Sequence, residues 1–489
     1  MMERNPTATR DNNLNRVVTQ ARRALTPYRR LQTAGLIHRE GSFYPSVHYP
    51  PITMYPNMGV DEVLEGWKLP PEGLLDVYVH IPFCVRKCDF CHYPVKAGKD
   101  LDERDRYLDA LRDEMDIWLR RTGLERIPVR SVLVGGGTPT HLTPKQLDRF
   151  LTDLCARLDR SAMTQFNFDV DPSTVLGPEG LERMRVLEAH GVDRITFGIQ
   201  SLEDATLRRM NRPHDAAGAK AAVALSMKMG FTTNIEFIFG YPGQTVPSWT
   251  SMMQEAIALD TDEIQLYRLK IEPYGDGEGR ILRLASESGP NWPTAEEAIQ
   301  MKAAARILLN EAGYHETLSR VYSRHPEIYS HYAHNQCCDL LEQVGFGQTA
   351  FSSLRDRFSI NTQSLPEYYD TVAAGRLPIT RGLRRDRDEQ ARWSFLLPLK
   401  ARNVIKSRFL EQTGKTPGDL IGAKLNILKE YGLLEESAEE LGLTELGRFY
   451  AEEIAHQFHS EEHIPFPTEC YEDGPLHPHR NPALVAGMV

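Results

Sequence analysis

The chain has 489 residues, of which 41% are hydrophobic, and its formal net charge at pH 7 is −10. This length suits two to four domains with a sizeable core, and the acidic balance argues against a broad face that binds nucleic-acid phosphates. No apolar run approaches the ~20 residues needed to cross a bilayer, and the N-terminus lacks a signal peptide's apolar region. The seven cysteines are clustered, which is typical of an intracellular protein with a metal or cofactor site, so we expect a cytoplasmic location.

Residues 1–70 are predicted to form an N-terminal arm and a strap rich in aromatic residues and proline. Residues 1–40 hold eight arginines against three acids, and proline and asparagine interrupt any helix. This composition favours a solvated arm over a transit peptide or a nucleic-acid arm. The strap, "FYPSVHYPPITMYP" at residues 43–56, is predicted to pack in an extended form against the fold.

Residues 71–290 alternate between predicted strands and predicted helices. Six segments rich in β-branched and aromatic residues recur at intervals of roughly 30 residues, with helical periodicity between them. The six predicted strands are "DVYVHIP" (76–82), "VRSVLVGGG" (129–137), "QFNFDVDP" (165–172), "VDRITFGIQS" (192–201), "FTTNIEFIFG" (231–240) and "DEIQLYRLKIEP" (262–273). The alternation predicts a parallel α/β sheet, either a barrel or an open doubly wound sheet, with the ligand site at the carboxyl ends of its strands.

The remaining residues are predicted to form smaller units. Residues 291–389 begin with a long helix and continue as a substrate-side extension that includes an irregular stretch at 316–356. Residues 390–462 are predicted to be a winged-helix-like domain, and residues 463–489 a loose tail. A winged helix suggests DNA, but Lys424–Glu462 holds ten Glu against three Lys or Arg. Duplex phosphates would be repelled, so we expect a packing domain that binds no nucleic acid.

Three cysteines, Cys84, Cys88 and Cys91, follow the first predicted strand at the spacing C-x3-C-x2-C. Structural zinc needs four ligands, usually as two separate pairs, and only His80 and His92 could complete such a set locally. Three thiolates suit an iron–sulfur cube in which one iron lacks a protein ligand and can chelate a cofactor. The motif therefore predicts a 4Fe–4S cluster as the metal site, with zinc and incidental thiols as the alternatives.

The segment "YVHIPFCVRKCDFC" resembles the signature of the radical S-adenosylmethionine (SAM) superfamily, C-x3-C-x-aromatic-C. From Tyr78 to Leu354, and again in the winged domain, the sequence is similar to one branch of it. That branch contains oxygen-independent coproporphyrinogen III oxidases, class C methyltransferases and heme chaperones. The resemblance implies a partial (β/α)6 TIM-like barrel with a C-terminal winged-helix-like α domain. It also implies that the open iron binds SAM and that one-electron reduction yields a 5′-deoxyadenosyl radical for hydrogen abstraction.

The resemblance also assigns the cofactor contacts. The run "GGGTPT" ends the second predicted strand, where glycines let the backbone approach a ligand and free N–H groups suit a carboxylate. Asp169 and Glu236 stand where the branch typically has Glu and Asp. Leu269 and Phe351 match apolar positions that would otherwise be taken as core, and Arg212 alone would be taken as a surface ion pair. The implied contacts are Tyr78, Phe90, Gly136, Gly137, Thr138, Asp169, Gln200, Arg212, Glu236, Leu269 and Phe351.

Tyr93, two residues after the third cysteine, bears on the type of reaction. Coproporphyrinogen oxidases tend to carry a fourth cysteine there, whereas the methyltransferase and chaperone relatives carry an aromatic residue. The resemblance therefore favours one-carbon transfer, with a second SAM molecule packed near Tyr93; the alternative is that Tyr93 seals the cluster from solvent. Decarboxylation of coproporphyrinogen III and a heme-chaperone role stay open, although "GFGQTAFS" lacks the His of the chaperones' GAGAHS-like segment.

Three further expectations follow from the resemblance. The strap is similar to a segment that covers the active site in the branch. A flavodoxin- or ferredoxin-like protein is expected to donate the electron to a monomeric chain that acts on a small-molecule substrate. Cys337 and Cys338 follow the recognisable His334-Asn335 pair and are expected to be ordinary partly buried thiols, with a redox or second-cluster role as the alternative.

Overall fold

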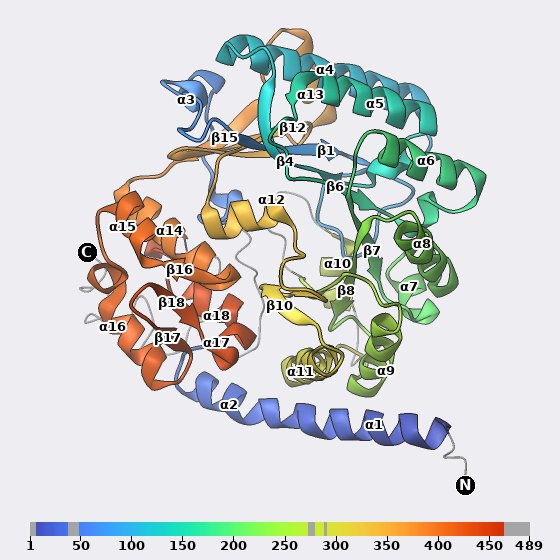
Figure 1. Cartoon of the computed structure of the whole chain (residues 1–489), viewed down its shortest axis with the longest axis vertical. Coiled ribbons are helices and arrows are strands. Elements are labelled where there is room, and N and C mark those ends of the chain that lie inside the picture. The colour runs from blue at the N-terminus through green and yellow to red at the C-terminus, as the bar shows by residue number, and fades with distance from the viewer. Residues whose placement is uncertain (1–5, 38–47, 272–278, 288–290, 464–489) are drawn as a thin grey trace.

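The computed structural model describes residues 6–37, 48–271, 279–287 and 291–463 (Figure 1). Residues 43–47 of the predicted strap and residues 464–489 of the predicted tail lie outside the described residues. A curved sheet of 13 strands dominates the fold, in the order β10-β11-β9-β8-β7-β6-β4-β1-β12-β13-β14-β15, with β5 beside β4. In Figure 1 the sheet is curved, and its concave side faces the C-terminal domain.

The predicted parallel strands form the centre of this sheet. They run parallel to one another and are β1 (Leu75–Ile81), β4 (Ile127–Gly136), β6 (Gln165–Val170), β7 (Arg194–Gln200), β8 (Thr232–Phe239) and β9 (Glu263–Arg268). Helices between and after them cover the outer face (Figure 1): α4 (Leu101–Thr122), α5 (Pro144–Arg157), α6 (Gly177–Ala189), α7 (Asp204–Arg209), α8 (Ala216–Lys228), α9 (Val246–Ile257) and α11 (Ala295–Glu311). The predicted partial barrel is thereby confirmed.

Local sequence sets where these helices begin and end. Asp100 accepts the N–H of Glu103 and caps α4, which ends at Gly123, a left-handed residue with φ 72°. Thr143 and Gln146 form a capping box at the start of α5, with Pro144 in the first turn. Such caps satisfy N–H groups that have no partner inside the helix.

The stretch 316–356 contains parts of four strands and two short helical segments, so the prediction of an irregular stretch holds only for the turns between them. Strands β11 (Val321–Ser323) and β10 (His315–Leu318) extend the edge at β9, and β12 (Gln343–Phe346) pairs in parallel with β1. Strands β13 (Phe351–Leu354), β14 (Arg357–Asn361) and β15 (Ile379–Arg384) follow as an antiparallel series. Most of these strands are short and buried on both faces, so the sequence shows no alternation for a period-2 search to detect.

The N-terminal arm is helical and packed, which corrects the expectation of a solvated arm. Helices α1 (Pro6–Ala21) and α2 (Leu25–Thr33), joined by η1 (Arg22–Ala24), run beneath α11 in Figure 1. Val17, Ala21 and Leu31 are fully or almost fully buried. An ion pair of 2.7 Å joins Arg16 to Glu311 at the end of α11. The apolar contacts outweigh the helix-breaking composition that the prediction relied on.

The C-terminal domain lies at the open side of the curved sheet. Its three-stranded sheet has the order β16-β18-β17, with β16 (Asn403–Ile405), β17 (Leu434–Glu436) and β18 (Glu440–Leu443). Around it pack α14 (Arg387–Ala401), α15 (Lys406–Thr413), α16 (Pro417–Glu430), α17 (Glu445–Phe449) and α18 (Ala451–His456), as a winged-helix-like domain requires. The domain meets the β10–β11 turn where the N–H of Ser319 donates to the carbonyl of Ala401 at 3.0 Å.

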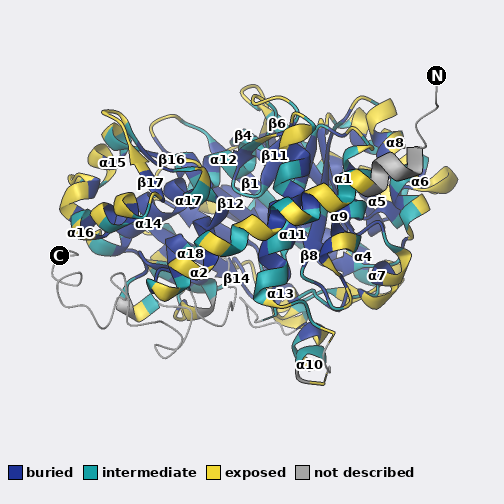
Figure 2. Ribbon diagram, turned by 90° about the horizontal axis from the view of Figure 1, so that it is seen from below, coloured by how far each residue is buried: buried dark blue, intermediate teal, exposed yellow. Residues whose placement is uncertain are grey.

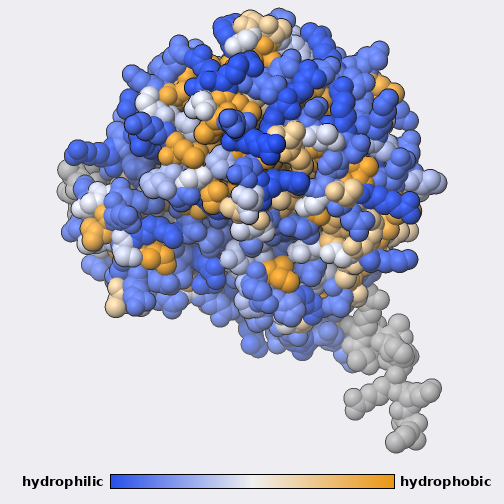
Figure 3. All heavy atoms as spheres, turned by 45° about the horizontal axis from the view of Figure 1, so that its top comes forward, coloured by the Kyte–Doolittle hydropathy of each residue, from blue (hydrophilic) through white to orange (hydrophobic). Residues whose placement is uncertain are grey.

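Shorter elements complete the described chain: η2 (Ile52–Met54), α3 (Val60–Leu64), β2 (Phe83–Cys84), β3 (Lys96–Ala97), η3 (Pro139–His141), β5 (Leu158–Asp159), η4 (Pro172–Thr174), α10 (Arg280–Glu287), α12 (His331–His334), η5 (Asn335–Asp339), α13 (Leu365–Ala373) and η6 (Glu461–His463). Figure 2 shows a continuous buried interior, with α10 projecting from the body. The face in Figure 3 is mostly hydrophilic, with apolar residues scattered over it. None of the described helices is both long and apolar enough to span a membrane.

Candidate active site

The cysteine loop leaves β1 at the carboxyl end of the parallel strands and is pinned to the end of α7. The N–H of Asp89 donates to the carbonyl of Met210 at 3.1 Å, and the side-chain amide of Asn211 donates to the carbonyl of Lys87 at 2.8 Å. Cys88 is buried, while Cys84 and Cys91 are partly exposed. The loop is therefore an ordered wall of the ligand end of the sheet, as its place after the first strand predicts.

Each of the three sulfurs has its own hydrogen-bond donor. Arg212 Nη1 lies 3.0 Å from Cys88 Sγ, and Thr138 Oγ1 lies 3.6 Å from Cys84 Sγ. The backbone N–H of Tyr93 donates to the thiol of Cys91 and lowers its pKa. Burial acts in the opposite direction and is the larger effect, so the pKa of Cys84 is raised to about 12 and that of Cys91 to about 11.

These donors fit a bound cluster. Among the described residues, no three Cys, His, Asp or Glu side chains converge as the ligands of a single ion would. A 4Fe–4S cluster makes a different demand, because each thiolate binds a different iron and hydrogen bonds to the sulfurs tune it. Cys84, Cys88 and Cys91 would hold three irons, and a bound metal would keep their thiols deprotonated despite burial.

The glycine run at the end of β4 serves the cysteine loop more directly than it serves a ligand. The N–H of Gly137 donates to the carbonyl of Ile81 at 2.8 Å, and the N–H of Thr138 donates to that of Phe83 at 2.7 Å. A Cβ at Gly137 would lie 2.8 Å from the carbonyl oxygen of Phe83, and one at Gly136, where φ is 106°, would meet the ring of His80 at 2.7 Å. The expectation of free N–H groups for a carboxylate is therefore wrong at Gly137 and Thr138.

Arg212 is buried rather than a surface ion pair. One guanidinium nitrogen lies 2.6 Å from Asp171 Oδ2 and also bonds the carbonyl of Gly198, while the other donates to Cys88. The side chains of Arg212 and Asp171 are only 9% and 6% exposed. The Arg212 charge and the His214 side chain hold the pKa of Asp171 well below its usual range despite burial. Charge-assisted contacts of this kind fix the cation beside the cluster ligand.

Two further acids lie on the inner face of the sheet. Burial, with a smaller contribution from Glu236, raises the pKa of Asp169 to about 8. Burial also raises the pKa of Glu236, which accepts a hydrogen bond of 3.1 Å from Tyr267. A Cβ at Gly135 would lie 2.4 Å from Asp169 Oδ2, so glycine makes room for this carboxyl. Among the described residues no ion pair engages either acid, and arginines such as Arg194 act on them only as a smaller influence than burial, so both can accept hydrogen bonds from a ligand.

Gln200 adds a third acceptor. Its backbone has φ 73°, in the left-handed region that residues other than glycine rarely adopt. Its Oε1 is buried and has no hydrogen-bond partner among the described residues. A buried acceptor left unsatisfied costs free energy, which a ligand donor would recover.

The other predicted contacts divide into polar and apolar positions. Tyr78 is a partly buried residue of β1, and its hydroxyl lies 3.0 Å from His80 Nδ1. Phe90 packs against an apolar cluster that contains Leu269, so the surroundings of Leu269 are core-like, as its residue type alone suggested. The ring of Phe351 packs against that of His48 at a tilt of 35°, with ring centroids 4.3 Å apart. 

Tyr93 and the paired cysteines lie in contrasting surroundings. The side chain of Tyr93 is 42% exposed, whereas Cys338 is 8% exposed and packs with Leu318, Val321 and Ala401. Cys337 packs against the same group. The paired cysteines therefore have the surroundings of ordinary buried thiols.

Sequence reasoning did not single out Asp171, His214 or Tyr267. Asp171 follows β6 two residues after Asp169, and its position at a strand end is the signal that could have found it. His214 Nδ1 lies 3.6 Å from Asp171 Oδ1. Tyr267, on β9, could be identified only from its contact with Glu236 on the neighbouring strand β8.

Comparison with known proteins agrees with this site. Residues 78–256 match the family model of the Radical SAM superfamily. The heme chaperone HemW of Bacillus subtilis (strain 168) is 27% identical over 389 residues, which cover 78% of this chain and 99% of the relative. The oxygen-independent coproporphyrinogen III oxidase of Salmonella typhimurium (strain LT2) is 26% identical over 399 residues, which cover 78% of this chain and 85% of the relative.

A solved structure supports the fold. The coproporphyrinogen III oxidase HemN from Escherichia coli, a radical SAM enzyme, superposes with a TM-score of 0.71 at 23% identity, over 83% of this chain and 96% of that one. The chain thus contains a radical SAM domain, and its resemblance to this branch is confirmed. Its cofactors are a 4Fe–4S cluster and SAM. Neither of the two sequence relatives carries the name of a methyltransferase.

Proposed function

We propose that this chain is a radical SAM enzyme that abstracts a hydrogen atom from a tetrapyrrole-class substrate and oxidatively decarboxylates a propionate side chain to a vinyl group. In that step the substrate radical loses carbon dioxide and one electron, and a one-electron acceptor takes up the electron. The observation that carries the enzyme proposal is the arrangement around Arg212, which joins Cys88 to the buried acid Asp171 beside further acceptors on the sheet. The names of the relatives, a coproporphyrinogen oxidase and a heme chaperone, support the tetrapyrrole class.

Each group of residues has a distinct task in this proposal. When bound, the reduced cluster supplies the electron that splits SAM, and the fragment so formed takes the substrate hydrogen. Arg212 stabilises the anionic sulfur of Cys88. The carboxyls of Asp169 and Glu236 and the Oε1 of Gln200 accept hydrogen bonds from the amino and hydroxyl groups of SAM. A flavodoxin- or ferredoxin-like protein donates the electron, and a cytoplasmic, monomeric chain belongs to the same proposal.

A second candidate, one-carbon transfer from a second SAM molecule, is favoured by Tyr93. Its N–H bonds the thiol of Cys91 while its side chain stays 42% exposed. An aromatic face beside the cluster loop suits packing against a sulfonium cofactor or a conjugated ring. The same exposure argues against Tyr93 as a complete seal over the cluster.

Anaerobic turnover of coproporphyrinogen III with methyl-deuterated SAM separates the candidates. The proposal predicts release of carbon dioxide, one 5′-deoxyadenosine per hydrogen abstracted, and a product without deuterium. Deuterium in the product would instead establish one-carbon transfer. Tight heme binding with neither product would show a heme chaperone and overturn the enzyme proposal.

A further inference from the structure

The turn between β12 and β13 places a strained residue at the ligand end of the sheet. Thr349 has φ 61°, a left-handed conformation that is unfavourable for a β-branched side chain. Within residues 343–354, all of which the structure describes, Thr349 is the one residue that is not buried. Its hydroxyl lies 3.4 Å from Nδ1 of His80, which stands four residues before Cys84.

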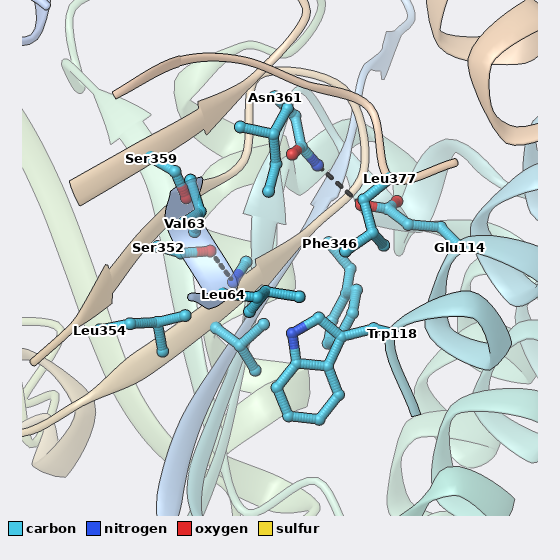
Figure 4. Close-up of a pocket in the computed structure, with 13 residues that line it drawn as sticks. Val63, Leu64, Glu114, Trp118, Phe346, Ser352, Leu354, Ser359, Asn361 and Leu377 are labelled. Atoms are coloured by element: carbon cyan, nitrogen blue, oxygen red, sulfur yellow. Dashed lines mark hydrogen bonds between the residues drawn. The ribbon is translucent and has the colours of Figure 1, made fainter. Parts of the chain in front are cut away.

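A buried carboxylate on α4 holds the start of this turn. Glu114 Oε2 accepts the N–H of Gly347 at 2.8 Å and the hydroxyl of Tyr368 at 2.7 Å. Asn361 donates to Glu114 Oε1 at 2.7 Å, as Figure 4 shows, and to the carbonyl of Gly347 at 2.8 Å. Elements α4, α13 and β14 thus fix Gly347, whose φ of 100° suits only glycine.

A second α4 side chain, Tyr107, joins the turn to the strand that leads to the cysteines. Its hydroxyl accepts the N–H of Gln348 at 2.9 Å and donates to the carbonyl of His80 at 2.7 Å. Tyr107 is fully buried. The two residues that precede Thr349, Gly347 and Gln348, are therefore both held by α4, which explains how the strained conformation persists.

The cavity beside Glu114 is too small to be a ligand pocket, so ligand binding there does not account for the strained turn. It is lined by α3, α4 and the strands β12 to β14 (Figure 4), and its volume is about 10 Å³. That volume holds at most one water molecule. The strained backbone conformation is that of Thr349, and the threonine hydroxyl lies near His80.

We propose that Thr349 is a specificity-determining residue, whose hydroxyl donates a hydrogen bond to a carboxylate side chain of the tetrapyrrole substrate. Glu114 and Tyr107 are positioning residues that impose its backbone conformation. This inference rests on the proposed function, since it names the substrate class of the same site. A threonine hydroxyl facing a carboxylate forms a charge-assisted bond, which a valine of the same shape cannot form.

The test uses anaerobically reconstituted full-length protein and coproporphyrin III as the probe, with binding followed by fluorescence quenching. Thr349→Val is expected to weaken probe binding about tenfold, and Thr349→Ser to keep it within about twofold. SAM affinity, measured by calorimetry, stays unchanged in both. Thr349→Gly relieves the backbone strain, so its Tm rises by about 1 °C while probe binding falls as in Thr349→Val.

Tyr107→Phe tests the positioning role, with Tyr369→Phe as its matched control. Tyr107→Phe is expected to weaken probe binding roughly threefold or more. Tyr369 is also a buried tyrosine that bonds α4, but it lies on α13 and its hydroxyl donates to Glu103 at 2.7 Å rather than to the turn, so Tyr369→Phe leaves probe binding unchanged.

The outcomes separate this inference from the proposed function. If the unmodified chain binds coproporphyrin III but Thr349→Val binds it equally well, the inference alone is overturned. Loss of SAM affinity in Thr349→Val, with probe binding intact, would overturn it as well by assigning the hydroxyl to the cofactor. If the unmodified chain does not bind the probe, the tetrapyrrole class and the inference both fail, while SAM cleavage by the same sample would leave the radical SAM assignment standing.

Discussion

Arg212 and Cys88 lie 3.0 Å apart, guanidinium nitrogen to sulfur, at the inner edge of the cysteine loop. The same guanidinium lies 2.6 Å from Asp171, so one buried cation joins a predicted cluster ligand to an acid at the end of β6. Removing this cation would therefore lower the stability of the fold and, as a separate effect, weaken SAM binding at the cofactor site.

Arg212→Ala is expected to lower the free energy of unfolding by about 3–5 kcal/mol, because it leaves Asp171 buried without its cation. It should also weaken SAM binding by roughly ten- to a hundredfold through loss of a charge-assisted contact. Urea denaturation and calorimetry measure the two effects. Arg209→Ala, a change at an exposed neighbour, serves as the control. Unchanged SAM affinity would mean that Arg212 has only a structural role, as the ion-pair partner of Asp171.

Replacing Cys84, Cys88 or Cys91 with Ala should abolish the charge-transfer absorption of the reconstituted cluster, because each thiolate holds one iron. Iron content should fall from about four per chain, and SAM cleavage should disappear. Cys155→Ala is the control, since Cys155 lies on α5, away from the loop. A loop variant with full iron content and full cleavage would refute the cluster assignment.

Asp169 should give SAM binding a proton linkage. Its pKa is raised to about 8, so the folded protein keeps a proton that the unfolded chain loses near pH 4, and stability falls as pH rises between these values. If the carboxylate accepts hydrogen bonds from SAM, binding near pH 7 releases a proton. Calorimetry in two buffers of different ionisation enthalpy would detect the release. Asp169→Asn should abolish it, and equal heats in both buffers for the unmodified protein would contradict the acceptor role.

The helical N-terminal arm should contribute to stability. Leu31→Ala is expected to cost about 2–5 kcal/mol, because Leu31 is 1% exposed against the core. Arg16→Ala removes only a partly exposed ion pair with Glu311 and should cost less than about 1 kcal/mol. Both values come from urea denaturation. Equal, small losses would mean that the arm is held loosely.

The sequence allowed prediction of those parts that local pattern controls. The six parallel strands are long, with helices between them, and the cysteine spacing is itself a motif, so both were accessible. Strand β12 was missed because it is a four-residue buried strand that pairs with β1 across more than 260 residues of chain. The arm was misjudged because its helices are stabilised by contacts with α11 rather than by their own propensity.

The site shows the same division between local and long-range information. Arg212 could be named from its motif, but its partner Asp171 and its contact with Cys88 depend on how β6, β7 and the cysteine loop meet. Similarly, the glycines at the end of β4 pointed to close backbone approach, but only the structure shows that the cysteine loop is what approaches Gly137.

The measurement that tests the central claim most directly is SAM cleavage by the anaerobically reconstituted, reduced protein. The account predicts 5′-deoxyadenosine and methionine in equal amounts, formed by the unmodified chain and absent with Cys88→Ala, which lacks the thiol beside Arg212. A protein that carries its full cluster and binds SAM, yet forms neither product after reduction, would contradict the account.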